Sequence, residues 1–120
     1  CIQALAVMPI VAAYHGNDWS PDLAFHTVAG GISVEVPPRK QQVLDILQNV
    51  GGMALAVDDK ATLRWQKLLA LKEGIYAEPT SAAVFAGLEQ LVRTGTIRRM
   101  DRVLVPITGT GLKDFLPSQQ

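Results

Sequence analysis

The sequence predicts an α/β fold in three layers, with a mostly parallel sheet flanked by helices. Short apolar runs without strict alternation, as expected of strands covered on both faces, occur at residues 2–7, 53–57 and 103–107. Segments with apolar residues at helical spacing stand between these runs. The predicted order is therefore strand, helix, helix, strand, helix, helix, strand.

The first third of the chain carries the least regular hydrophobic pattern. Residues 2–7 form the expected first strand, and residues 8–14 form an apolar turn or short helix. Residues 23–29 make a weak helical stretch, and the alternation of residues 32–36 predicts an exposed edge segment. No lysine or arginine precedes Pro37-Pro38, so we expect this third to be buried or covered by a neighbouring surface.

Two helices in the middle of the chain are marked by their spacing and by their end signals. In residues 39–50 the apolar side chains fall on one face, and Gly51-Gly52 ends the helix. Asp58 or Asp59 is placed to cap the next helix, which Gly74 ends. The predicted apolar face of this second helix consists of Ala61, Trp65, Leu68 and Leu69.

A third helix is predicted from Pro79 to Arg93, because proline suits the first turn and Gly95 lies where a C-terminal glycine is expected. Its small residues would let a strand or another helix approach closely. They are Ala82, Ala83, Ala86 and Gly87. A polar connector then returns the chain to residues 103–107, the expected central strand.

The charge pattern excludes several classes of partner. The 11 basic and 11 acidic residues give a formal net charge of zero. Without a large basic cluster, we expect neither nucleic acid nor an anionic membrane surface as a partner. His15 and His26 have no acidic or thiol neighbours in a ligand pattern, so no metal site is expected.

The cysteine content and the hydropathy predict a cytoplasmic protein. The single cysteine, Cys1, fits a reducing compartment, and no apolar run reaches the roughly 18 residues that span a membrane. Cys1 also leads directly into a predicted buried strand. We therefore expect a further part of the protein upstream of it.

One candidate binding segment follows the expected strand 103–107. Thr108-Gly109-Thr110-Gly111 matches neither a Walker phosphate loop nor a dinucleotide-binding fingerprint. A hydroxyl at a strand end, followed by glycines and a helix-like Leu-Lys-Asp, suits a small polar or anionic ligand, because ligands of α/β sheets bind at the carboxyl ends of strands. A plain strand-to-helix turn explains the same residues equally well.

The second candidate is the segment from Glu78 to Ser81, Glu-Pro-Thr-Ser. Its simplest explanation is the chemistry of a helix start, with Glu78 or Thr80 as the capping residue and negative charge favoured at that end of the helix dipole. A binding role requires Glu78 and Ser81 to face the same cleft as Thr108.

Taken together, two segments resemble the C-terminal half of threonine synthase. They are residues 74–83, Gly-Ile-Tyr-Ala-Glu-Pro-Thr-Ser-Ala-Ala, and residues 104–114, Leu-Val-Pro-Ile-Thr-Gly-Thr-Gly-Leu-Lys-Asp. That enzyme belongs to the fold type II pyridoxal-phosphate enzymes, which have the tryptophan synthase β fold. The resemblance extends over about residues 23–114.

The resemblance implies that residues 1–120 are the C-terminal part of a catalytic domain, an incomplete portion of the large domain of such an enzyme. It also implies pyridoxal phosphate as the cofactor of the full-length protein. Thr108 matches the residue whose hydroxyl meets the pyridine nitrogen, and Gly109 would let the backbone pass close to the ring. Glu78 and Ser81 match the motif that faces the active-site cleft.

Two departures limit what the resemblance implies. Thr110 stands where many relatives have a histidine, which leaves contact with a substrate phosphate open at this position. The family keeps its Schiff-base lysine and its phosphate loop upstream of the matched region, so we expect this chain alone neither to hold the cofactor nor to catalyse a reaction. The lysines present match none of the family's lysine contexts: Lys40, Lys60, Lys67, Lys72 and Lys113.

The predicted function is that of a fragment of a threonine synthase-like lyase of amino-acid biosynthesis. In full length such an enzyme converts O-phosphohomoserine and water to threonine and phosphate, so the expected substrate is a small amino acid, and a homo-oligomer is expected. Two alternatives stay open. The first alternative is a fragment of another fold type II enzyme, such as a threonine or serine dehydratase or a cysteate synthase-like enzyme. The second is a non-catalytic α/β binding or interaction module.

Overall fold

A computed structural model describes residues 1–113 of the chain. The strands are β1 (Ile2–Ala4) and β2 (Leu55–Val57), which pair in parallel with Ile2 opposite Leu55. The α-helices are α1 (Pro9–Tyr14), α2 (Lys40–Asn49), α3 (Asp59–Glu73) and α4 (Pro79–Arg93). Short 3-10 helices occupy Pro21–Leu23, Gly30–Ile32 and Gly111–Lys113. Within the described range, no helix combines the length and apolar character needed to cross a membrane.

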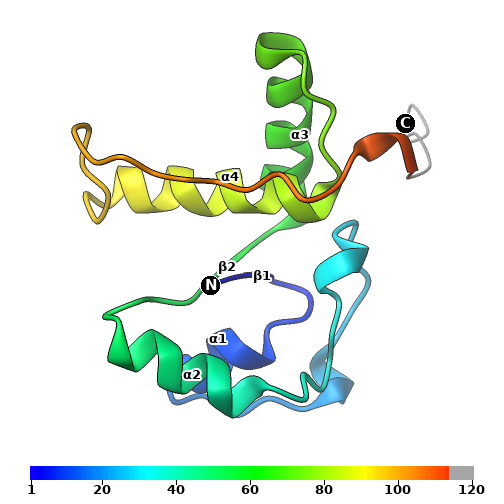
Figure 1. The fold of residues 1–120 in the computed structure, drawn as a ribbon. Coiled ribbons are helices and arrows are strands. Elements are labelled where there is room, and N and C mark those ends of the chain that lie inside the picture. Colours follow the sequence, from blue (N-terminus) through cyan, green and yellow to red (C-terminus); the bar gives the residue numbers. More distant parts are fainter. Residues whose placement is uncertain (114–120) are drawn as a thin grey trace.

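The two strands lie between helical layers, as a three-layer α/β arrangement requires (Figure 1). α4 packs on one face of the sheet, where Val57 and Ala83 belong to a buried cluster. α1 and α2 cover the other face around Leu47 and Ala54. The described part of the chain is therefore a small α/β unit, smaller than the sheet that the sequence predicts, with two parallel strands.

Alternation along β2 explains how one short strand separates two helical layers. Leu55 and Val57 pack on the α4 side, whereas Ala54 and Ala56 contact the side of α1 and α2. Gly87 of α4 lies so close to the sheet that a Cβ there would overlap the side chain of Ile2. The small residues of α4 thus allow the close approach that the sequence predicts.

The start of α1 is fixed by a buried side chain of β1. The Oε1 atom of Gln3 accepts hydrogen bonds from the backbone N–H groups of Ile10 and Val11, each at 2.9 Å. These two N–H groups lie in the first turn of α1, where no carbonyl of the helix can pair with them. Gln3 therefore takes the place of a capping residue and ties the helix to the sheet.

The helix ends agree with the local signals in the sequence. The side chain of Asp58 accepts a hydrogen bond from the Ala61 N–H at 2.7 Å, which makes it the N-cap of α3. Gly74 ends α3 in the left-handed conformation at φ 69°, which favours glycine. α4 has the predicted bounds, and α2 lies within the predicted residues 39–50.

The buried face of α3 differs from the predicted one. The residues of α3 that are buried are Thr62, Gln66 and Leu69. Ala61 and Trp65 are only partly buried, although they do pack against the cluster around Val57. Leu69 is buried as predicted, but the prediction missed Thr62 and Gln66 because it followed apolar side chains, whereas hydrogen bonds allow their hydroxyl and amide groups to be buried.

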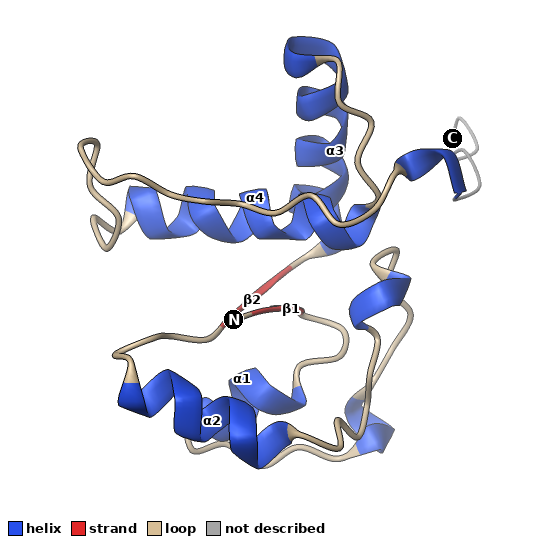
Figure 2. Cartoon of the chain, in the orientation of Figure 1, coloured by secondary structure: helices blue, strands red, loops and turns tan. Residues whose placement is uncertain are grey.

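The predicted central strand at residues 103–107 is wrong for the described chain. Figure 2 shows this segment as a loop. No hydrogen bond within residues 1–113 joins its backbone to another segment, and Val103, Leu104 and Ile107 are exposed. A strand exists only where a neighbour pairs with it, and the described residues provide none here.

Two weaker predictions in the first third also need correction. Of the helical stretch predicted at residues 23–29, only Leu23 is helical, as the last residue of a 3-10 turn. Residues 33–36 are exposed, as predicted, but they pair with no strand among residues 1–113. Gly30–Ile32 forms a 3-10 turn that contacts α4.

The N-cap of α3 provides a test of this assignment. Replacing Asp58 by Ala removes the acceptor of the Ala61 N–H and is expected to lower the free energy of unfolding by about 1 kcal/mol. Asp58→Asn is the matched control and should cost much less, because asparagine caps helices as well as aspartate does. Urea-induced unfolding, followed by circular dichroism, measures both variants. Equal losses in the two would contradict the capping role.

Candidate functional site

The two sequence motifs meet at the N-terminal end of α4. The Glu78 N–H donates to the carbonyl of Gly109 at 3.0 Å, and the Gly111 N–H donates to the carbonyl of Tyr76 at 2.8 Å. Between them, Ala77 and Thr110 form an antiparallel bridge. We call this unit, residues 76–78 with residues 108–111, the clasp.

Ser81 joins the clasp to α4. Its side chain is buried, and its Oγ accepts hydrogen bonds from the N–H groups of Thr108 at 3.1 Å and Gly109 at 3.3 Å. The same oxygen lies 3.3 Å from the Oγ1 of Thr108. A serine oxygen has two lone pairs and one hydrogen, so with both lone pairs in use the hydrogen is donated to Thr108. The hydroxyl hydrogen of Thr108 is then left for another acceptor.

Thr108 itself is exposed. It lines a shallow hollow of about 470 Å³ together with its neighbours from residues 107–110 and the segment Gly74–Tyr76. The hollow therefore offers the hydroxyl group of Thr108 beside a stretch of backbone. Such an edge suits a flat ligand that carries a hydrogen-bond acceptor.

Glu78 occupies the N-cap position of α4 but makes no side-chain cap. Its Oε2 lies 2.6 Å from the Nζ of Lys113 instead, and its carboxylate lies so close to Gly109 that a Cβ on that residue would overlap it. A side chain at position 109 would therefore displace the Glu78 carboxylate. Glu78 and Ser81 each contact the backbone that carries Thr108.

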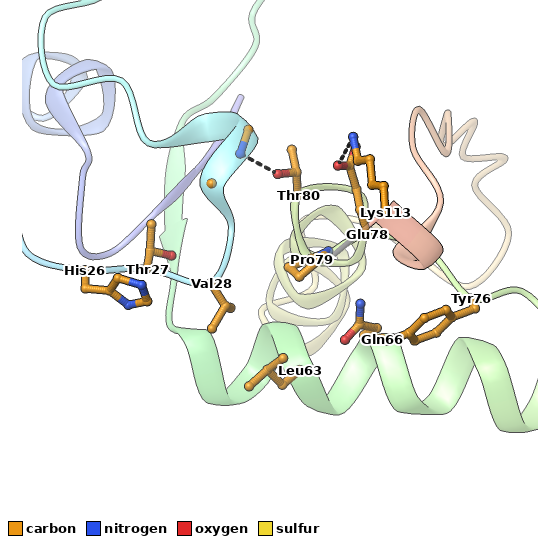
Figure 3. A pocket seen from close by; sticks show the side chains of 12 residues that line it. His26, Thr27, Val28, Leu63, Gln66, Tyr76, Glu78, Pro79, Thr80 and Lys113 are labelled. Atoms are coloured by element: carbon orange, nitrogen blue, oxygen red, sulfur yellow. Dashed lines mark hydrogen bonds and ion pairs between the residues drawn. The ribbon is translucent and has the colours of Figure 1, made fainter. Parts of the chain in front are cut away.

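A second cavity, of about 510 Å³, is lined by Glu78 of the clasp and by the other side chains drawn in Figure 3. Its walls come from the loop 26–31, from α3, from the start of α4, and from Lys113. Glu78 lines this cavity, whereas Thr108 lines the separate hollow. The structure therefore brings Ser81 and Thr108 into contact, but among the described residues Glu78 and Thr108 do not line one common cleft.

Polar side chains that the sequence marked only as helix caps, or did not mark at all, hold the cavity walls. Asp59 accepts from the Thr27 hydroxyl at 2.6 Å and from the Val28 N–H at 2.9 Å. The Oγ1 of Thr80 accepts from the Gly31 N–H at 3.1 Å. Gln66 donates its Nε2 hydrogen to the carbonyl of Ala77 at 2.7 Å. The signal that marks Gln66 is its burial in the middle of a helix. The sequence alone does not show this burial.

The remaining sequence candidates have local roles or border the cavity. The Oγ1 of Thr110 accepts from the Leu112 N–H at 3.3 Å, which supports the 3-10 turn after the clasp. His15 contacts the carbonyl of Ala54 at 3.2 Å, and His26 lines the cavity. Asp114, at the end of the second motif, lies outside the described residues.

Comparison with known proteins places these motifs in a family. The family model described as pyridoxal-phosphate dependent enzyme matches residues 1–109. The chain belongs to this pyridoxal-phosphate dependent enzyme family. The match includes Glu78, Ser81, Thr108 and Gly109, the residues that the clasp brings together.

Individual relatives within the family are threonine synthases. The chain is 42% identical over 115 residues to the enzyme of Methanocaldococcus jannaschii, which covers 94% of this chain and 28% of that protein. It is 40% identical to the threonine synthase of Methanosarcina acetivorans over the same shares, and 35% identical to that of Halalkalibacterium halodurans over 73% of this chain and 25% of that protein. The chain thus spans less than a third of the length of these relatives.

A solved structure of the same fold is a threonine deaminase from the organism abbreviated T.th.. It superposes with a TM-score of 0.67 over 97% of this chain and 40% of that chain, at 22% sequence identity. At this level of identity the likeness shows the fold alone. The described residues are therefore a small α/β piece that matches part of a fold type II pyridoxal-phosphate enzyme.

The residues of the clasp fit one edge of the cofactor of this family. When bound, pyridoxal phosphate supplies an electron sink. The hydroxyl of Thr108 is the kind of donor that a pyridine nitrogen accepts from, whereas the space beside the Cα of Gly109 is filled by the Glu78 carboxylate. Of the lysines in the described part, those on α2 and α3 line neither the cavity nor the hollow, and Lys113 pairs with Glu78.

Ser81 provides a direct test of the clasp. Ser81→Ala leaves two backbone N–H groups without their acceptor, so we expect the free energy of unfolding to fall by about 1–3 kcal/mol. Amide hydrogen exchange at Thr108 and Gly109 should become faster. Ser33→Ala, at an exposed serine, is the control and should stay within about 0.5 kcal/mol of the unchanged chain. Unchanged exchange at both amides in Ser81→Ala would contradict the assignment.

Proposed function

We propose that the chain is the C-terminal part of the catalytic domain of a threonine synthase-like enzyme. In full length this enzyme would convert O-phosphohomoserine and water to threonine and phosphate, with a small amino acid as its substrate. The observation that carries the proposal is the contact of Ser81 with Thr108, which holds the Thr108 hydroxyl at the edge of the hollow. Identity of 40–42% to two threonine synthases over 94% of the chain supports this choice of reaction.

Thr108 would set the electronic character of the cofactor. A neutral hydroxyl that donates to the pyridine nitrogen does not stabilise a positive charge there, as a carboxylate would. The ring would then withdraw electrons more weakly, and proton transfers would depend more on groups elsewhere. The backbone of Gly109 would lie close to the ring edge, and Glu78 and Ser81 would hold that backbone in place.

The rest of the enzyme would supply what the clasp does not. The covalent lysine and the phosphate-binding loop would come from residues outside this chain, so we propose that the chain alone does not hold the cofactor. Exposed apolar residues fit this picture. Leu104 is 93% exposed, and Phe25 and Val36 are also exposed. These surfaces would be covered by the remainder of the domain or by a second subunit of a homo-oligomer.

A chimera tests the proposed reaction. In the threonine synthase of Methanocaldococcus jannaschii, the matching 115-residue stretch is replaced by this chain. We expect the chimera to bind pyridoxal phosphate and to release phosphate and threonine from O-phosphohomoserine. Thr108→Val should lower kcat/KM by roughly tenfold, the size expected for one lost hydrogen bond, while Thr108→Ser should retain most of it.

The chimera also separates the alternatives. Release of a 2-oxo acid and ammonia from threonine, with no phosphate from O-phosphohomoserine, would show a dehydratase instead. A folded chimera that binds no cofactor would favour a non-catalytic module and contradict the proposal. Equal rates for Thr108→Val and Thr108→Ser would remove the role assigned to the hydroxyl.

The exposed segment 103–107 makes a prediction for the isolated chain. Leu104→Lys places a charge in this segment and should increase solubility and the monomer fraction. Without the charge, we expect the exposed apolar segment to associate with other copies of the chain. Met100→Lys, at a methionine that is 89% exposed but outside the segment, is the control and should have a smaller effect. Size-exclusion chromatography at several concentrations measures both. A larger effect of Met100→Lys would contradict the prediction.

A further inference from the structure

The ion pair between Glu78 and Lys113 crosses from the clasp to the 3-10 turn that follows it (Figure 3). The side chain of Glu78 is only 12% exposed, whereas that of Lys113 is 58% exposed. A carboxylate with so little contact to water loses most of its hydration, and a nearby ammonium group offsets this loss. Among the described residues that line the cavity, Glu78 is the one carboxylate, and Lys113 is the one lysine or arginine.

We propose that Lys113 is a positioning residue that acts through Glu78 on Gly109 and Thr108. It keeps the Glu78 carboxylate in the clasp, and the carboxylate in turn restricts the backbone on which Thr108 is presented. The effect of Lys113 on the cofactor rests on the proposed function. The contacts that carry it lie within the described chain and need no cofactor.

The first step is the contact of Glu78 with Gly109. The backbone N–H of Glu78 donates to the Gly109 carbonyl at 3.0 Å, and its carboxylate packs against the position that a Cβ of residue 109 would take. Gly109 is therefore held from two directions by one residue. If the carboxylate moved out toward water, the side-chain half of this contact would be lost.

The second step is the fixed direction from which Lys113 approaches. The 3-10 turn Gly111–Lys113 starts at Gly111, which is buried and bonded to the Tyr76 carbonyl. A Cβ on Gly111 would lie 2.8 Å from the Tyr76 ring, so the turn lies directly against the segment that precedes Glu78. The turn thus places the ammonium group of Lys113 beside Glu78, the residue that holds Gly109.

Hydrogen exchange on the full chain tests this inference without a cofactor. Lys113→Met leaves the Glu78 carboxylate without its partner, so we expect the amides of Thr108 and Gly109 to exchange about tenfold faster. Amides in the middle of α4 should be unchanged. Lys113→Arg keeps a cation in reach and should retain most of the protection. Lys72→Met, at an exposed lysine of α3, is the matched control and should have no effect at these amides.

A double-mutant comparison separates positioning from general loss of stability. In a Glu78→Gln background no buried charge needs a partner, so Lys113→Met should then change exchange by less than about twofold. Gly109→Ala pushes the carboxylate out of its place and should reproduce faster exchange at Thr108 with Lys113 still present. If Lys113→Met unfolds the chain, a folded Glu78→Gln/Lys113→Met variant supports the inference, and an unfolded one overturns it.

The inference is also overturned if Lys113→Met speeds exchange no more than Lys72→Met does, or if its effect is as large in the Glu78→Gln background. Neither result depends on the reaction. The chimera tests the proposed function through product formation, so the failure of one proposal is distinguishable from the failure of the other.

Discussion

The buried hydroxyl of Ser81 is the contact on which the candidate site depends. It lies in the first turn of α4 and accepts from two consecutive backbone N–H groups, those of Thr108 and Gly109. The segment before them, residues 103–107, has no hydrogen bond to another part of the described chain. A segment without strand partners can still present a side chain in a defined direction if its end is held in this way. Here the Ser81 oxygen holds the end of the segment together with the backbone hydrogen bonds of the clasp.

Ser81 can serve this purpose because α4 itself is placed firmly. The helix packs on the two-stranded sheet through small residues, and Ala82, Ala83 and Ala86 are almost completely buried. Loops are then tied to the helices by single polar side chains, among them Thr80, Asp59 and Gln66. In a unit with so few strands, these side-chain hydrogen bonds satisfy backbone groups that a larger sheet would pair. The site is thus built on a helix end, with loops attached to it.

Membership of the pyridoxal-phosphate dependent enzyme family implies pyridoxal phosphate as the cofactor of the full-length enzyme. The hydroxyl of Thr108 is the group that we propose to meet the ring of the cofactor, while the cavity at Glu78 contains the ion pair of Glu78 and Lys113. The chain covers only 28% of its archaeal threonine synthase relatives, and large apolar side chains such as Leu104 remain exposed. Both facts support our proposal that the chain is part of a larger catalytic domain.

What the sequence determined by itself is local or compositional. The bounds of α4, the N-cap Asp58 and the left-handed Gly74 follow from hydrogen bonds and sterics within a few residues, so sequence signals predicted them. The family motifs could also be recognised in the sequence, because they are runs of specific residue types. The tertiary structure decided what depends on distant partners. Residues 103–107 are no strand because nothing in the described chain pairs with them, and α3 buries Gln66 because the Ala77 carbonyl accepts its hydrogen bond. The separation of the hollow at Thr108 from the cavity at Glu78 likewise depends on a tertiary contact. The two motifs meet where the Glu78 N–H donates to the carbonyl of Gly109.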